Sequence, residues 1–251
     1  MSNESLSKKK LAEASFLIRN GRPVEAIPIL DVIVDADPTC SWAVEERGRA
    51  KQFSGDLEGS IADFTRMIAQ WPTNPKGLTC RADVRGQAGD LRGAIDDYSS
   101  AIELNPKHPF AFLQRGRLRA ELGEHIAAIS DFTADMDVSP NGRLSGLLNR
   151  GRTKYVAGDL SGAITDLTEA IALEGDRPIF SALFRGRAKF AAKEFNGAIA
   201  DFSAVIEAFP QLTNAYRHRA EARALSGDKQ GAADDQSRYE QLGGRDLPAY
   251  L

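Results

Sequence analysis

The apolar residues of this chain recur at helical spacing in short runs that turn residues separate. One run consists of Leu57, Ile61, Phe64 and Ile68, which follow one another at intervals of four, three and four residues. These intervals place the four side chains on one face of a helix. Gly55 and Asp56 precede the run, and this pair predicts the end of one helix and the cap of the next. Pro72 follows the run and cannot continue a helix, so the pattern predicts a helix, a tight turn and a second helix.

This helix–turn–helix pattern repeats along the chain. The stretch 47–64, RGRAKQFSGDLEGSIADF, returns in related form at 81–98, 115–132, 150–167 and 185–202. The successive starting points are 34, 34, 35 and 35 residues apart. A fixed period of this size is typical of stacked-repeat proteins, in which each repeat packs mainly against its neighbours.

The repeats resemble those of the tetratricopeptide repeat (TPR) family, whose unit is a helix–turn–helix of about 34 residues. Aligned to that unit, seven repeats cover 7–40, 41–74, 75–108, 109–142, 144–177, 179–212 and 213–246. The small residue that the family has at position 8 is here Ala14, Gly48, Ala82, Gly116, Gly151, Gly186 and Ala220. The resemblance implies an all-α, right-handed α-solenoid. An N-terminal extension (1–6) and a C-terminal tail (247–251) then flank the array.

Six repeats carry an arginine at position 7 and an aspartate at position 23, whereas the first repeat has neither residue. Because the two residue types are present or absent together, we expect them to form an ion pair between the two helices of a repeat. The alternative is a row of arginines for an anionic ligand, which the matching acids would neutralise. The expected structural pairs are Arg47–Asp63, Arg81–Asp97, Arg115–Asp131, Arg150–Asp166, Arg185–Asp201 and Arg219–Asp235.

In the family, positions 2, 5, 9, 12 and 13 of the first helix line a concave groove in which peptides bind. Position 9 is here Ser15, Arg49, Asp83, Arg117, Arg152, Arg187 and Glu221, and no acidic partner repeats in step with the four arginines. Apolar side chains at the other groove positions include Phe110, Leu113, Tyr155, Phe180 and Phe190. Arginine and aromatic residues often anchor recognition surfaces. The resemblance therefore implies that these arginines and apolar residues bind a peptide.

Two alternatives concern the remaining charges. The position 9 arginines are either solvated or paired with acids such as Glu45, Glu46 and Glu121, in which case they anchor no ligand. Position 11 is basic in six repeats, as Lys51, Arg85, Arg119, Lys154, Lys189 and Arg223. We expect the stems of these side chains to cover apolar surface while their charges reach water.

The clamp that some family members use for a C-terminal carboxylate is absent from this sequence. Asn149 occupies one of its positions, but Leu113, Arg117, Phe180 and Phe184 stand where the clamp needs lysine, asparagine and basic residues. The sequence therefore does not predict binding of chaperone tails.

Catalytic, metal-binding and cofactor-binding motifs are also missing. The histidines His108, His125 and His218 fall in different repeats, and Cys40 and Cys80 lack metal-ligand spacing and are expected to be reduced thiols. A net charge of −3 and a pI near 5.7 argue against non-specific nucleic-acid binding. The sequence has no signal peptide and no run of ~18 apolar residues, so we expect no membrane span and a cytoplasmic location.

We predict a non-enzymatic scaffold for protein–protein interaction, without a cofactor or a metal. Its concave groove would bind an extended segment of a protein partner with acidic and apolar side chains. The alternative is an assembly module that self-associates weakly through the array ends or the convex face, because the first repeat is degenerate and the last has a polar second helix. An RNA-binding helical repeat is a further alternative, and the acidic pI counts against it.

Overall fold

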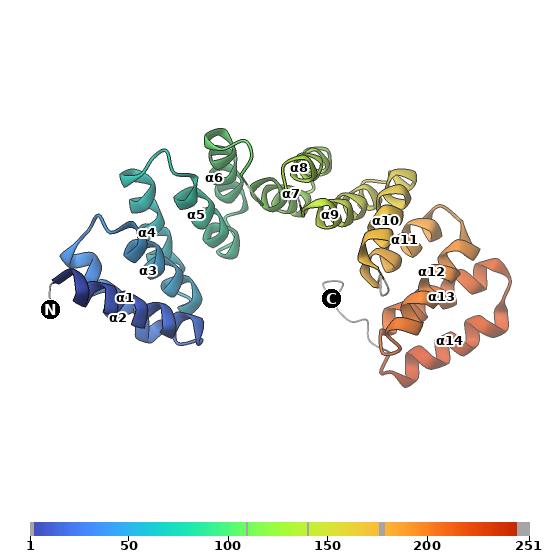
Figure 1. Ribbon diagram of the computed structural model, residues 1–251. Coiled ribbons are helices and arrows are strands. Elements are labelled where there is room, and N and C mark those ends of the chain that lie inside the picture. Colours follow the sequence, from blue (N-terminus) through green and yellow to red (C-terminus); the bar gives the residue numbers. More distant parts are fainter. Residues whose placement is uncertain (1–2, 109, 140, 176–178, 245–251) are drawn as a thin grey trace. The chain divides into compact units, whose positions relative to one another are not determined.

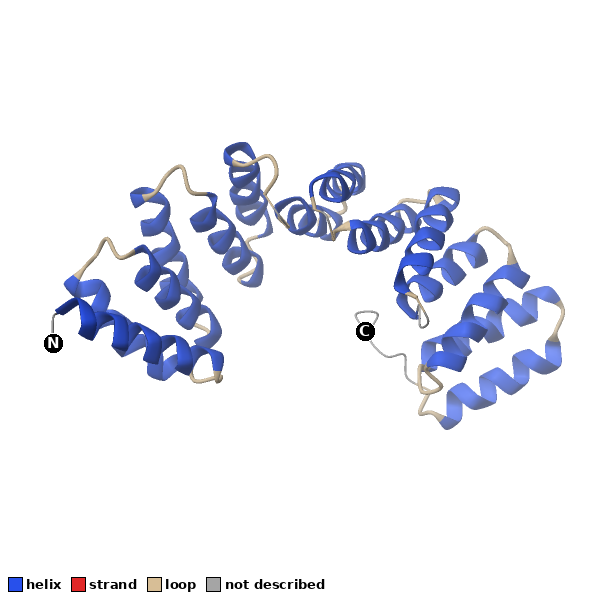
Figure 2. Cartoon of the chain, in the orientation of Figure 1, coloured by secondary structure: helices blue, strands red, loops and turns tan. Residues whose placement is uncertain are grey.

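The computed structural model describes residues 3–108, 110–139, 141–175 and 179–244. These residues form fourteen α-helices and no strand (Figures 1 and 2). Consecutive helices pair in chain order, so the predicted all-α array of helix–turn–helix repeats is confirmed. The predicted C-terminal tail at 247–251 lies outside the described residues.

The helix bounds follow the predicted repeats closely, except that α1 begins within the predicted N-terminal extension. The helices are α1 (Asn3–Arg19), α2 (Pro23–Ala36), α3 (Ser41–Ser54), α4 (Leu57–Gln70), α5 (Pro75–Gln87), α6 (Leu91–Leu104), α7 (Ala111–Glu121), α8 (His125–Val138), α9 (Arg143–Val156), α10 (Leu160–Glu174), α11 (Ile179–Ala191), α12 (Phe195–Ala208), α13 (Thr213–Ser226) and α14 (Lys229–Gln241).

The helices fall into two compact units, which we describe separately. Unit 1 spans residues 1–122 with α1 to α7, and unit 2 spans residues 123–251 with α8 to α14. Within each unit, every helix packs against the next helix along the chain. The first helices of neighbouring repeats also touch, as α1 and α3 do in unit 1 and α9, α11 and α13 do in unit 2. We call the surface formed by the first helices of a unit its first-helix face.

The turns within the second, third, fifth and seventh repeats have the predicted chemistry, whereas Glu124 in the fourth repeat makes no side-chain cap hydrogen bond. Gly55 has a φ of 88°, and a carboxylate oxygen of Asp56 accepts a hydrogen bond of 2.9 Å from the backbone N–H of Gly59. Asp90, Asp159 and Asp228 make the same cap. The sixth repeat differs, because Lys193 adopts a φ of 62° in place of a glycine and the Glu194 side chain makes no cap hydrogen bond.

Glycine at position 8 allows the two helices of a repeat to approach closely. A Cβ atom at Gly48 would lie 2.8 Å from Cζ of Phe64, and one at Gly186 would lie 2.7 Å from Cε1 of Phe202. Both rings are fully buried and occupy the space that a larger residue would need. These glycines are therefore packing residues.

In five of the six predicted ion pairs, both residues belong to the same unit, and the structure contains all five pairs. They are Arg47–Asp63, Arg81–Asp97, Arg150–Asp166, Arg185–Asp201 and Arg219–Asp235, with Nη2–Oδ1 distances of 2.5 to 2.7 Å. In each pair, Nε also donates to the second carboxylate oxygen, so the pairing is bidentate. The sixth pair, Arg115–Asp131, would join the two units and stays a prediction.

The same arginines also connect successive repeats. The Nη1 atom of Arg81 donates to the hydroxyl of Thr65 at 3.1 Å, and that of Arg150 donates to Thr133 at 3.0 Å. The acceptor is position 25 of the preceding repeat, and its other members are Asp31, Ser99, Thr168 and Ser203. Each arginine thus links the second helix of its own repeat to the second helix of the preceding repeat. The repeat pattern alone did not indicate this connection.

The prediction that the position 11 charges are solvated is wrong for five of the six residues. Lys51 Nζ lies 2.9 Å from Oδ2 of Asp63, the same carboxylate that Arg47 holds. Arg85, Lys154, Lys189 and Arg223 contact their repeat's aspartate in the same way, at 2.8 to 3.0 Å. A buried carboxylate has several lone-pair sites to satisfy, which explains why it takes a second cation. We call this set of position 7, 11, 23 and 25 contacts the ion-pair ladder.

Candidate functional site

The predicted anchor Arg49 is paired within unit 1. Its Nη2 lies 2.8 Å from Oε1 of Glu45, and Nζ of Lys76 lies 2.8 Å from Oε2 of the same carboxylate. The Glu45 side chain is 7% exposed, whereas those of Arg49 and Lys76 are 43% and 49% exposed. In this repeat the position 9 arginine is therefore paired with an acid, which is the alternative given by the sequence. A buried carboxylate requires such partners.

A pocket of about 610 Å³ lies next to Arg49, between α3, α5, α6 and α7. Its lining includes Asp83, Tyr98 and Phe110. The Tyr98 hydroxyl donates a hydrogen bond to Oδ1 of Asp83. Phe110 is 63% exposed and has a φ of 67°, a conformation that residues with a Cβ atom seldom adopt. The pocket therefore combines a carboxylate with exposed aromatic surface.

Two further predicted contacts of unit 1 behave differently from each other. Leu113 is 5% exposed, because protein encloses its side chain, and its role in binding stays a prediction. Arg117 is exposed, and no ion pair to it is found within the described part of unit 1. Arg117 is thus accessible but is not organised by neighbouring groups.

In unit 2, the predicted arginines stack on aromatic rings. The Cζ atom of Arg152 lies 4.5 Å from the centroid of the Phe184 ring. The Cζ atom of Arg187 lies 5.3 Å from the Tyr155 ring and 5.5 Å from the Phe184 ring. Stacking on two rings holds the Arg187 guanidinium in place and leaves its N–H edges able to donate. We call Arg152, Tyr155, Phe184 and Arg187 the stacked cluster.

Phe184 was not predicted as a site residue, although a regularity of the repeats indicates it. Position 9 of one repeat meets position 6 of the next, as the hydrogen bond of Ser15 to Glu46 shows at 3.4 Å. Arg152 and Phe184 have the same relation. Pairing these two positions in the sequence would have placed Phe184 beside Arg152.

His218 lies close to two arginines of this face and to one acid. His218 stacks on Phe202, with ring centroids 5.5 Å apart. Burial lowers the pKa of His218, and the charges of Arg217 and Arg187 lower this pKa further, while Glu221 acts in the opposite direction. Protonation of His218 is therefore disfavoured mainly by burial and in addition by the charges of Arg217 and Arg187.

The remaining predicted aromatic residues of unit 2 lie near the cluster in sequence but differ in environment. Phe180 is 42% exposed in the first turn of α11. Phe190 is partly buried and packs edge-to-face on Phe195 at 5.8 Å. Phe180 is thus available for contact with a ligand, and Phe190 mainly supports the core.

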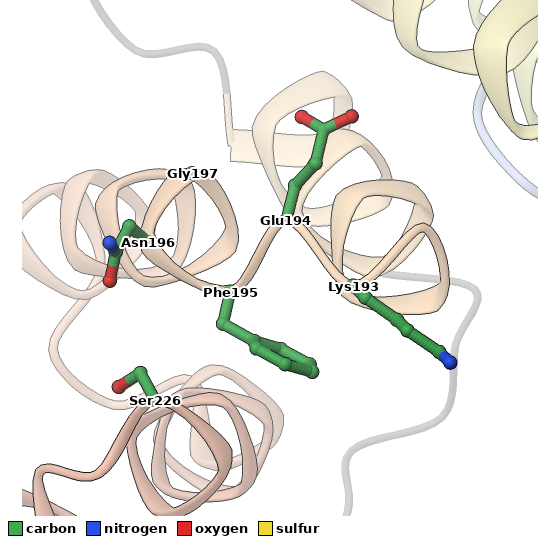
Figure 3. A pocket seen from close by; sticks show the side chains of 6 residues that line it. All are labelled: Lys193, Glu194, Phe195, Asn196, Gly197 and Ser226. Carbon is green, nitrogen blue, oxygen red and sulfur yellow. The ribbon is translucent and has the colours of Figure 1, made fainter.

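A second hollow, of about 370 Å³, lies at the turn between α11 and α12 near the end of α13 (Figure 3). Lys193, Glu194, Phe195 and Ser226 contribute to its lining. In Figure 3 the side chains of Lys193 and Glu194 extend in different directions. None of the predicted site residues lines this hollow.

The described residues contain neither a candidate membrane span nor a candidate metal site. None of their helices is both long and apolar enough to cross a membrane. Nor do they contain a group of three or more His, Cys, Asp or Glu residues that could hold a metal ion.

Comparisons with known proteins agree with this fold. The family model described as tetratricopeptide repeat matches residues 81–135, and no curated protein matches the chain. A tetratricopeptide repeat protein from Parabacteroides merdae is similar in structure, with a TM-score of 0.68, 21% identity, and coverage of 94% of this chain and 93% of that one. The C-terminal part of a TPR repeat-containing protein from Cytophaga hutchinsonii gives a TM-score of 0.77 at 16% identity, covering 95% and 97%. YrrB, a TPR protein with an unusual peptide-binding site, gives 0.62 at 16% identity, covering 74% and 95%.

The chain therefore has the fold of a tetratricopeptide repeat protein, and the resemblance seen in the sequence is confirmed. This fold suggests a scaffold for protein–protein interaction, and proteins that have it are generally not enzymes.

Proposed function

We propose that the protein is a non-enzymatic interaction scaffold, and that the first-helix face of unit 2 binds an extended segment with acidic and apolar side chains. The observation that carries this proposal is the stacked cluster. Arg187 lies against two rings, and within the described residues no carboxylate contacts it. A carboxylate of a partner can accept the guanidinium N–H groups without displacing an internal acid.

Apolar surface next to the cluster suits the rest of such a segment. Phe180 is exposed at the start of α11, the helix that also carries Phe184 and Arg187. The arginines near His218 favour acidic over basic segments. The structures that are similar include YrrB, a TPR protein with a peptide-binding site.

The test uses a fluorescein-labelled nonapeptide of alternating Glu and Leu as the probe, with the Lys and Leu counterpart as the control probe. We expect Arg152→Gln together with Arg187→Gln to weaken binding of the acidic probe roughly thirtyfold, since each of the two anchors contributes on the order of 1 kcal/mol. Arg117→Gln is the matched control, because Arg117 holds the same repeat position in unit 1. Fluorescence anisotropy at low and high salt measures the affinity.

Two outcomes would contradict the proposal. One is unchanged affinity in the double variant. The other is an equal loss in Arg117→Gln, which would indicate attraction by general positive charge. Glutamine keeps most of the side-chain stem, so a gross packing defect should not imitate the loss. Circular dichroism of each variant checks that the helices are intact.

A second candidate is weak self-association through the N-terminal end of the array. The α2 helix exposes Val24 and Val32, which are 66% and 53% accessible, and Pro28 lies between them on the same face. Most other repeats have polar or small residues at these positions. Light scattering at high protein concentration distinguishes the candidates, and a strictly monomeric protein would remove this one.

A further inference from the structure

The pocket of unit 1 differs in charge from the stacked cluster of unit 2. Asp83 occupies position 9, where four other repeats carry arginine. Its Oδ1 accepts the Tyr98 hydrogen bond, and within the described residues Oδ2 receives none. The carboxylate therefore faces the pocket with an oxygen that can accept a further donor.

The two cations that line this pocket are already committed. Arg49 and Lys76 each lie 2.8 Å from Glu45, whose buried carboxylate needs both cations as partners. An acidic ligand would have to compete with this internal acid. A basic ligand meets no such competitor at Asp83, because no cation lies within ion-pair distance of it among the described residues.

The Asp83 carboxylate is accessible in the pocket and close to surrounding protein. The residue is exposed by surface area, but nearby protein still raises the pKa of the Asp83 carboxyl through desolvation. The Tyr98 hydrogen bond and the charge of Arg49 lower this pKa, and they rank below desolvation. A bound cation would stabilise the ionised carboxylate directly.

Aromatic surface lies in the same pocket. Phe110 is 63% exposed, and its φ of 67° places a bulky side chain in a backbone conformation that residues with a Cβ atom seldom adopt. Strained residues of this kind are found preferentially at ligand sites. Aromatic faces attract ammonium and guanidinium groups and cover their aliphatic stems.

We propose that this pocket binds a basic side chain, lysine or arginine, of a protein partner. Asp83 pairs with the cationic end, and Phe110 covers the stem. This site is separate from the acidic-segment site of unit 2, and neither proposal depends on the other. Together they describe a scaffold that binds a basic side chain on unit 1 and an acidic segment on unit 2.

The experiment titrates the ¹⁵N-labelled full chain with three acetylated, amidated pentapeptides of sequence Ser-Leu-X-Leu-Ser. The central residue X is lysine, norleucine or glutamate, so that stem and charge are separated. We expect the lysine probe to bind about fivefold more tightly than the norleucine probe, as a partly exposed ion pair of ~1 kcal/mol gives. Its chemical-shift changes should centre on Asp83, Tyr98 and Phe110.

Asp83→Asn keeps the shape and the acceptor for Tyr98 but removes the charge. In this variant the lysine probe should bind no better than the norleucine probe. Glu221→Gln removes an acid at the same repeat position in unit 2 and should leave the preference for lysine intact.

Three results would each overturn the proposal. They are equal binding of the lysine and norleucine probes, preferred binding of the glutamate probe, and the absence of shifts at the pocket with every probe. Preference for the glutamate probe would show that Arg49 and Lys76 are the recognition groups instead. The acidic-segment proposal would stand or fall separately on its Arg187 variant.

Discussion

Unit 1 and unit 2 share the ion-pair ladder but differ in the charge of three successive first helices, which are α3, α5 and α7 in unit 1 and α9, α11 and α13 in unit 2. At the groove positions of α3, α5 and α7, the cations are Arg49, Lys76 and Arg117, and the acids are Glu45, Asp83 and Glu121. At the same positions of α9, α11 and α13, the cations are Arg152, Arg187 and Arg217, and the acid is Glu221. The charges cancel over these three helices of unit 1 and leave an excess of two positive charges in unit 2, while the groove positions of α1 add Lys8 and Arg19 at the N-terminal end of unit 1.

This difference shows that some positions of the repeat serve helix packing and others are free to vary in charge. The ladder uses positions 7, 11, 23 and 25, which hold helices together, and these residues are alike in both units. Positions 2, 5 and 9 do not take part in the ladder, so they can vary in charge without loss of packing. Stability should therefore respond equally in the two units, while binding should not.

The largest expected effect tests the equality of the ladders. Asp97→Asn in unit 1 and Asp235→Asn in unit 2 each leave an arginine pair without its buried carboxylate. We expect each variant to lose about 3–5 kcal/mol of unfolding free energy, as when one partner of a buried pair is removed. Urea denaturation measures the loss.

The chain supplies matched controls for these variants. Asp96 and Asp234 are the exposed neighbours of the two ladder aspartates, and their replacement by asparagine should change stability by less than about 0.5 kcal/mol. A large loss in only one unit would break the comparison.

The next effect concerns close helix packing. Gly48→Ala and Gly186→Ala each place a Cβ atom within 2.8 Å of a buried phenylalanine ring, so we expect a loss of about 1–3 kcal/mol in both units. Gly86→Ala is the control, because its Cβ would meet only Leu118 at 3.6 Å. Since alanine favours helix, that control should gain up to about 1 kcal/mol. A loss of the same size in Gly86→Ala would reject the packing explanation.

A smaller effect is expected at the turns. Lys193 in unit 2 holds the left-handed conformation that glycine holds at Gly89 in unit 1. Lys193→Gly should stabilise the protein by roughly 1 kcal/mol, and Gly89→Lys should destabilise it by a similar amount. Thermal unfolding of the two variants measures the shifts. Changes of the same sign in both would contradict the equivalence of the turns.

The smallest expected effect is the pH dependence of unit 2. The pKa of His218 is lowered below its usual 6.5, so the unfolded chain binds a proton that the folded chain resists. Stability should therefore fall as pH drops through the region below about 6.5. His218→Gln should flatten this part of the curve, and an unchanged slope between pH 7 and pH 5 would contradict the assignment.

The sequence predicted the fold well because the same local signals recur in successive repeats. The turn at Gly55 and Asp56 and the pair of Arg47 with Asp63 follow from local chemistry that recurs in phase. The second cation on Asp63 was missed, although position 11 is basic in the same six repeats that carry the aspartate, because a long basic side chain on a helix surface commonly extends into water.

The site was harder to predict because it depends on contacts between repeats. Arg49 and Arg187 hold the same repeat position, yet one pairs with Glu45 and the other stacks on Tyr155. Those neighbours come from positions that vary from repeat to repeat. The Asp83 pocket was likewise invisible, because Phe110 and Tyr98 approach Asp83 only in the folded unit.

The most direct test of the charge difference is the pKa of His218, measured by NMR with and without the acidic Glu and Leu probe. If the probe binds at the stacked cluster, its carboxylates offset Arg187 and Arg217, and the pKa of His218 rises. The Lys and Leu probe should leave this pKa unchanged. An unchanged pKa at saturation with the acidic probe, or probe-induced shifts confined to unit 1, would contradict the account.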